Sequence, residues 1–134
     1  MEFAVTTKEI HLDGSRHASA VSVAGEVDVF TAPRLRETLL ELERDNIHHV
    51  VLDLERVAFM DSVGLGVLLG ALRRARAGGG NLVLCGASER LRRLFEITGL
   101  SGAFLTAEDV KQGLELLNRP AVDAGGPAAR GGQR

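Results

Sequence analysis

An acidic residue and a hydroxyl residue stand side by side at Asp61 and Ser62. They follow an apolar run and precede two closely spaced glycines, Gly64 and Gly66. This pair is compatible with three kinds of chemistry. Either side chain can accept hydrogen bonds from the free N–H groups at the start of a helix. Ser62 can also be a nucleophile if a base lies beside it. In the third case, a phosphate on Ser62 adds about −1.5 to −2 charges at the positive end of a helix.

Nucleophilic chemistry has the least support of the three. The motif G-x-S-x-G is absent, because Met60 and not glycine stands two residues before Ser62. Four histidines are available as bases: His11, His17, His48 and His49. The first two flank a turn, and the last two begin the strand that leads to Asp61. We expect that strand to separate them from Asp61 by roughly 15–20 Å, at about 3.3 Å per residue. We therefore expect no catalytic residue and no enzyme.

Phosphate-loop and metal chemistry are not indicated either. The stretch GLGVLLG lacks the G-K-[ST] ending, and its glycines follow the expected helix start instead of forming the loop before it. The acids Glu26, Asp28, Asp53 and Asp61 have no cluster of His or Cys at ligand spacing beside them. We expect neither a bound metal nor a cofactor.

The composition is that of one globular domain, with 134 residues, 45% of them hydrophobic and 25% charged. A net charge of −2 and the absence of Trp and Tyr do not favour direct nucleic-acid or membrane binding. No apolar run is long enough to cross a bilayer, and charges interrupt the N-terminal segment, so we expect a cytoplasmic protein. The single cysteine, Cys85, lies in the apolar run NLVLC, and we expect it to be buried and unreactive.

Hydrophobic periodicity predicts the elements that must position Asp61 and Ser62. Alternation in Ala18–Val23 and the turn residues at Asp13–Arg16 predict a hairpin between about residues 3 and 29. The further strands are expected at about His48–Leu54, Asn81–Cys85 and Ala103–Leu105. Four helices are expected. The first spans about Ala32–Arg44 after a Thr31 cap, and the second spans about Ser62–Arg76. The third and the fourth begin after caps at Ser88 and Thr106.

This order predicts an α/β fold with a mixed, mostly parallel sheet of about five strands and with about four helices. We expect one domain over residues 1–117. A tail over residues 118–134, rich in Gly, Ala, Pro and Arg, is expected to be disordered.

Three segments resemble the STAS-domain anti-sigma factor antagonist family of bacteria. GEVDVFTAPRL, at Gly25–Leu35, resembles the family's G-E-L-D-x-x-T-A turn. Val50–Arg76 resembles its strand, its D-S-[ST]-G-L-G motif and the helix that follows. Gly79–Leu100 resembles its G-G strand and the next helix. The combination is more specific than the D-S-x-G-L-G motif alone.

The resemblance implies partner switching. The unphosphorylated antagonist binds an anti-sigma factor that is also a GHKL-type serine kinase, and a sigma factor is thereby freed. The kinase then phosphorylates the motif serine, and a serine phosphatase removes the phosphate. By position the acceptor here is Ser62. This sequence departs from the family pattern at Val63, where a second Ser or Thr is common, so Ser62 is the only hydroxyl in the motif.

The expected partner-binding residues include the motif, the turn before the first helix, and two basic residues further along the second helix. They are Asp28, Thr31, Asp61, Ser62, Gly64, Gly66, Arg73 and Arg74. Arg73 and Arg74 fit a solvated helix face equally well. An alternative function is a STAS scaffold or sensor subunit without a sigma-factor partner, although such proteins usually have an additional sensory domain. A ligand-binding module of the kind found in anion transporters is disfavoured by the lack of membrane segments.

Overall fold

The computed structural model describes residues 2–119. The predicted N-terminal hairpin is present. β1 (Ala4–His11) and β2 (His17–Val27) pair antiparallel, with His11 opposite His17 at the end next to the turn. The connection between the two strands contains a short 3-10 helix at Asp13–Ser15, in which Gly14 adopts a φ of 73°. A positive φ costs glycine little, so this residue suits the tight connection.

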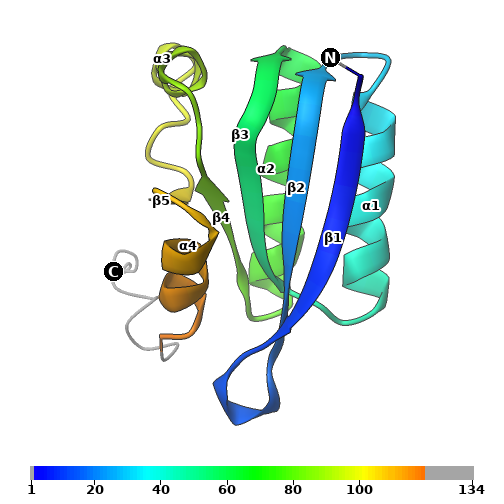
Figure 1. Cartoon of the computed structure of the whole chain (residues 1–134), viewed down its shortest axis with the longest axis vertical. Coiled ribbons are helices and arrows are strands. Elements are labelled where there is room, and N and C mark those ends of the chain that lie inside the picture. The colour runs from blue at the N-terminus through cyan, green and yellow to red at the C-terminus, as the bar shows by residue number, and fades with distance from the viewer. Residues whose placement is uncertain (1, 120–134) are drawn as a thin grey trace.

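The sheet contains five strands over the described residues, in the order β1-β2-β3-β4-β5. β3 (His49–Met60), β4 (Asn81–Cys85) and β5 (Leu105–Ala107) run parallel to β2, and only β1 is antiparallel. The predicted mixed, mostly parallel sheet is therefore confirmed. Because β2 and β3 are parallel, their carboxyl ends lie at the same edge of the sheet, at the top of Figure 1.

Helices cover both faces of the sheet, as Figure 1 shows. α1 (Ala32–Arg44) and α2 (Ser62–Ala77) pack side by side on one face, and α4 (Val110–Leu117) packs on the other against β3 and β4. α3 (Glu89–Ile97) contributes Leu91 and Phe95 to the larger core, on the side of α1 and α2. The smaller core under α4 is formed by Val51, Val83, Cys85 and Leu117.

Several element bounds differ from the sequence-based expectation. α1 and β4 have the expected bounds, whereas β3 continues to Met60 instead of ending near Leu54. The predicted Thr106 cap is wrong, because Thr106 lies in β5 and the carboxylate of Asp109 accepts from the N–H of Gln112 at the start of α4. Thr106 and Asp109 both have side chains that can cap a helix. The pairing of β5 with β4 keeps Thr106 in a strand, so the cap of α4 is Asp109.

The end of α4 is joined to the hairpin turn. The guanidinium of Arg16 donates to the carbonyl groups of Leu117 and Asn118, and Oδ1 of Asn118 accepts from the N–H of Asp13. Of the predicted disordered tail over 118–134, Asn118 and Arg119 belong to the described residues, and Asn118 is held by these hydrogen bonds. The rest of that prediction lies outside the described residues. Within the described residues, no helix combines the length and the apolar character that a membrane span requires.

Candidate functional site

Asp61 is the residue that caps α2. Its backbone is extended, and Oδ1 accepts hydrogen bonds from the N–H groups of Val63 at 2.9 Å and Gly64 at 3.2 Å. Its own N–H donates to the carbonyl of Val27 at 3.1 Å, which ties the start of α2 to the end of β2. The capping role that the sequence left open between Asp61 and Ser62 thus belongs to Asp61.

Ser62 is the first residue of α2, and its side chain is exposed. Among the residues that the structure describes, none forms a hydrogen bond with its hydroxyl group. Because Asp61 already satisfies the N–H groups of Val63 and Gly64, the Ser62 hydroxyl is not needed to hold the helix end. It is an accessible hydroxyl at the start of a helix.

Asp28 and Thr31 hold the loop between β2 and α1. Oδ1 of Asp28 accepts from the N–H groups of Phe30 and Thr31, at 2.9 and 3.1 Å. The Thr31 hydroxyl donates to the carbonyl of Glu26 at 2.6 Å and accepts from the N–H of Asp28. Thr31 precedes α1, but the prediction that its side chain caps the helix is wrong because its hydroxyl is used within the loop.

The two glycines of the motif have different surroundings. Gly64 is buried, and an added Cβ would lie 2.7 Å from Cγ of Met60 and 2.8 Å from Cγ1 of Val27. Gly66 is exposed, and an added Cβ would meet nothing within 4 Å. Close packing on the sheet explains Gly64, whereas Gly66 leaves a bare stretch of helix surface.

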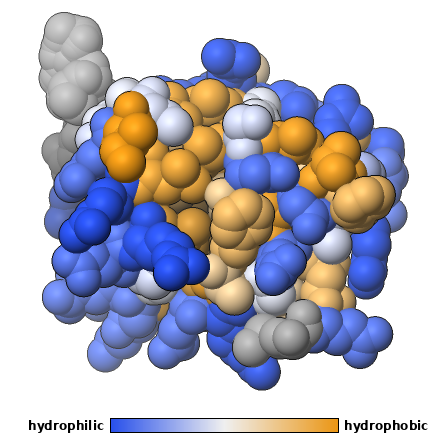
Figure 2. All heavy atoms as spheres, turned by 90° about the horizontal axis from the view of Figure 1, so that it is seen from above, coloured by the Kyte–Doolittle hydropathy of each residue, from blue (hydrophilic) through white to orange (hydrophobic). Residues whose placement is uncertain are grey.

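Exposed apolar side chains surround this end of the sheet. Of the five large hydrophobic residues that are most exposed among the described ones, four come from the segments around Ser62: Val29, Phe30, Phe59 and Val63. Phe30 is 85% exposed on the loop that Asp28 holds, and Phe59 lies next to Glu26 where β3 ends. We call these four residues the apolar surface. Figure 2, which looks down onto this end, shows hydrophobic residues gathered over its middle with hydrophilic ones around them.

The sequence analysis did not include these apolar residues among the candidates. A signal was nonetheless present, because Phe30 and Phe59 fall outside the apolar stripes of the predicted helices and next to the motifs. Val63, the departure from the family pattern, is 42% exposed and adds apolar area beside Ser62.

The structure does not bring Arg73 and Arg74 to this end. They follow Ser62 by 11 and 12 residues on α2, which places them roughly 16–18 Å further along its axis. Nε of Arg74 lies 3.3 Å from Oε1 of Glu43, so this side chain faces α1. Arg73 lines a groove at the far end of α2 together with Arg16 and Arg76. Their binding role therefore remains a prediction without geometric support.

All four histidines belong to the described residues, and none of them lies beside Ser62 as a catalytic base would. β3 begins at His49, one residue after His48, and runs the length of the sheet to Met60, so both are at its opposite end from Ser62. Cys85 is buried, as expected, and burial together with the nearby charge of Asp53 raises the pKa of its thiol to about 12. It remains a neutral thiol at physiological pH.

Comparison with known proteins places this arrangement in a family. The STAS domain profile matches residues 9–113. An anti-sigma-B factor antagonist of Staphylococcus epidermidis is 45% identical over 80 residues, which are 60% of this chain and 74% of that protein. The crystal structure of an anti-sigma factor antagonist from Mycobacterium paratuberculosis superposes with a TM-score of 0.72 at 28% identity, over 87% of this chain and 96% of that one.

The fold is also that of the Bacillus cell fate determinant SpoIIAA, solved in its phosphorylated form. The TM-score is 0.60 at 23% identity, and the match covers 80% of this chain and 96% of SpoIIAA. The profile match over residues 9–113 includes β2 to β5, the D-S-x-G-L-G motif at the start of α2 and the loop before α1. The chain therefore belongs to the STAS-domain family of anti-sigma factor antagonists.

Proposed function

We propose that this protein is an anti-sigma factor antagonist whose binding surface surrounds Ser62 and is switched off by phosphorylation of that residue. It would bind an anti-sigma factor that is a GHKL-type serine kinase and thereby free a sigma factor in the cytoplasm. The protein itself is then a substrate and not an enzyme. The observation that supports this proposal most is the exposed Ser62 hydroxyl, which lies beside the apolar surface and has no hydrogen-bond partner among the described residues.

In the unphosphorylated state, the apolar surface supplies the affinity. Phe30 is 85% and Val29 57% exposed, so a partner that covers them removes apolar area from water at about 25 cal/mol per Å². Aromatic side chains are frequent at the centre of protein interfaces. Gly66 lets the partner's backbone approach the first turns of α2, because no side chain stands between them.

Phosphorylation would oppose this contact. The kinase transfers the γ-phosphoryl group of ATP to Oγ of Ser62, with release of ADP and of the hydroxyl proton. The phosphate adds about −1.5 to −2 charges to a surface that the partner would otherwise desolvate. Oδ1 of Asp61 already accepts hydrogen bonds from the N–H groups of Val63 and Gly64. These two donors are therefore not free to bind the phosphate, which remains exposed. A serine phosphatase restores the hydroxyl by hydrolysis, with release of inorganic phosphate.

The fold would tolerate the modified residue. The phosphate would sit at the N-terminal end of a 16-residue helix, where the dipole stabilises negative charge. SpoIIAA, which has the same fold, has been solved in a phosphorylated form. The switch therefore acts on binding and does not require a change of fold.

Intact mass spectrometry with the cognate anti-sigma kinase and ATP tests the acceptor. We expect one added phosphate on the wild-type chain, none on Ser62→Ala, and one on the control Ser101→Ala, which removes another exposed serine. Phosphate on Ser62→Ala would show that the acceptor lies elsewhere.

Calorimetry tests the switch. We expect Ser62→Asp to bind the kinase more weakly than Ser62→Ala, with an unchanged circular dichroism spectrum. Equal affinity of the two variants would contradict the repulsion by charge, and failure of the wild-type chain to bind the kinase would contradict the function itself.

A further inference from the structure

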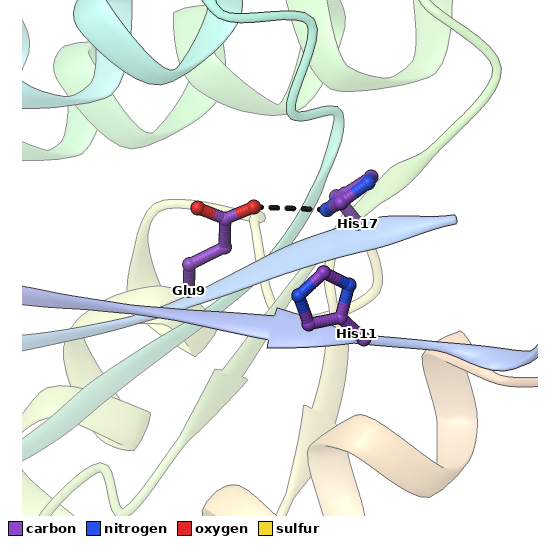
Figure 3. A group of neighbouring side chains, drawn as sticks. All are labelled: Glu9, His11 and His17. Carbon is purple, nitrogen blue, oxygen red and sulfur yellow. Dashed lines mark hydrogen bonds and ion pairs between the residues drawn. The ribbon is translucent and has the colours of Figure 1, made fainter. Parts of the chain in front are cut away.

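Three potential metal ligands meet on the N-terminal hairpin, at the end of the sheet opposite Ser62. They are Glu9 and His11 at the end of β1 and His17 at the start of β2. Nδ1 of His17 lies 2.8 Å from Oε2 of Glu9, and the centroids of the two imidazole rings are 4.6 Å apart. One ligand atom from each of the three residues lies within 4.8 Å of the others. Figure 3 shows the three side chains turned toward one another.

The strand register creates this cluster. His11 and His17 are direct cross-strand partners, so their Cβ atoms are held about 4.5–5.5 Å apart. Glu9 precedes His11 by two residues and therefore projects from the same face of β1. The tight turn at Asp13–Ser15 keeps the pairing in register, since the hairpin cannot slip without rebuilding it. The backbone thus places all three ligands before any ion binds.

The set of donor atoms matches a particular class of ion. Two imidazole nitrogens and one carboxylate oxygen form one of the known ligand sets of three-ligand zinc sites, in which a fourth position stays open to water. Bonds of about 2.1 Å in a tetrahedral site place ligand atoms roughly 3.4 Å apart. The separations here reach that value through small side-chain rotations, which are available because all three residues are exposed.

The immediate surroundings leave the cluster open to a cation. Two cations are neighbours of the cluster in the sequence. Lys8 precedes Glu9 in β1 and therefore projects from the other face of the strand. The guanidinium of Arg16 is directed elsewhere, because it donates to the carbonyl groups of Asp13, Leu117 and Asn118. Glu9 contributes one negative charge that an ion would neutralise. His17 would exchange its hydrogen bond with Glu9 for shared coordination of the same ion.

We propose that Glu9, His11 and His17 form a binding site for one divalent transition metal ion of the zinc type, with water completing its coordination. This site is separate from the phosphorylation switch, because the hairpin turn and the start of α2 lie at opposite ends of β2 and β3. A metal ion there would hold the two strands of the hairpin together at the end next to the turn. The phosphomimetic Ser62→Asp should accordingly bind the ion as well as the wild-type chain.

Calorimetric titration of the untagged, metal-free chain with zinc chloride tests the site. We expect one ion per chain, and affinity at least about tenfold lower in each of His11→Asn, His17→Asn and Glu9→Gln, which corresponds to about 1.4 kcal/mol or more. The controls His49→Asn and Glu115→Gln remove a histidine and a glutamate outside the hairpin and should bind as the wild type does. The proposal would be overturned if the wild-type chain showed no detectable zinc binding, or if the three variants bound zinc as tightly as the wild type does.

Cobalt(II) gives an independent readout of coordination. We expect the visible absorption of a tetrahedral cobalt site with the wild-type chain and its loss in His17→Asn, while the far-ultraviolet circular dichroism of the metal-free proteins stays the same. Because the three side chains are exposed, the substitutions leave the core intact. A cobalt spectrum that persists in the double variant His11→Asn/His17→Asn would show that the ion binds elsewhere and would overturn the assignment.

Discussion

Gly64 lies against Val27 so closely that a Cβ atom added to the glycine would stand 2.8 Å from Cγ1 of the valine. Gly66, two residues further along α2, would meet nothing within 4 Å. Two glycines of one motif therefore have separate roles. The first lets the helix approach the end of β2, and the second keeps the outer surface of the helix bare.

Alanine substitutions should separate these roles. We expect Gly64→Ala to lower the free energy of unfolding by about 1–3 kcal/mol, because the added methyl group overpacks the contact with Val27 and Met60. Gly66→Ala should raise it by up to about 1 kcal/mol through helix propensity, while weakening binding of the anti-sigma factor. Urea unfolding and calorimetry measure the two effects. Equal stability of the two variants would contradict the packing argument, and full binding by Gly66→Ala would contradict the close approach.

The apolar surface should matter for binding and not for folding. Phe30→Ala is expected to lower affinity for the anti-sigma factor by about 2 kcal/mol or more, as at other aromatic interface centres. Its unfolding free energy should change little, because the side chain is 85% exposed. Ile97→Ala is the matched control, since Ile97 is 76% exposed on α3. A similar loss of affinity in both variants would show that the contact is not centred on the loop before α1.

The Asp61 cap should contribute to stability mainly through its oxygen acceptor, with a smaller part from its charge at the start of α2. Asp61→Ala is expected to cost about 1 kcal/mol of unfolding free energy, because the N–H groups of Val63 and Gly64 lose their acceptor. Asp61→Asn keeps an oxygen acceptor and should stay close to the wild type. Ser88→Ala, which removes the cap of α3, should cost a similar amount without affecting the Ser62 switch. Chemical denaturation of the three variants compares these costs, and a loss in Asp61→Asn as large as in Asp61→Ala would show that the charge matters more than the acceptor.

Cys85 should make the fold sensitive to alkali. Its pKa is raised from 9.0 to about 12 by burial and by Asp53, so the unfolded chain loses the thiol proton at a lower pH than the folded chain does. The stabilising contribution is complete below about pH 9 and is lost as the pH rises toward 12. The chain has no Tyr, and its lysines are Lys8 and Lys111, so few other groups titrate in this window.

Urea unfolding between pH 8 and pH 11 measures this dependence. We expect stability to fall with pH in the wild type and to fall less steeply in Cys85→Ala, whatever the absolute stability of that variant. Identical slopes would show that the thiol remains protonated in both states or is ionised in both. Alkylation of Cys85 should accordingly be slow in the native chain and fast in urea, because the thiol is 1% exposed.

The sequence alone determined the elements whose signals are local. The Leu35, Leu39 and Leu42 spacing predicted α1 over its observed bounds, and the apolar run NLVLC predicted β4. The element order then predicted the mostly parallel sheet, because helices that alternate with strands return each strand to the same direction. The D-S-x-G-L-G motif likewise placed Ser62 at a helix start, since an acid and a hydroxyl before a helical pattern are a local cap signal.

Only the tertiary structure decided what depends on contacts between distant segments. Local chemistry allowed either Thr106 or Asp109 to cap α4, and pairing of β5 with β4 removed Thr106 from that role. The sequence made Asp61 and Ser62 equal candidates for the cap. In the structure, the N–H of Asp61 donates to the carbonyl of Val27, and this contact fixes the position of Asp61 at the helix start. The apolar surface and the cluster of Glu9, His11 and His17 also depend on strand register, which places His11 opposite His17 and Phe59 next to Glu26. Periodicity is a property of one segment, whereas a site is a property of how several segments pack.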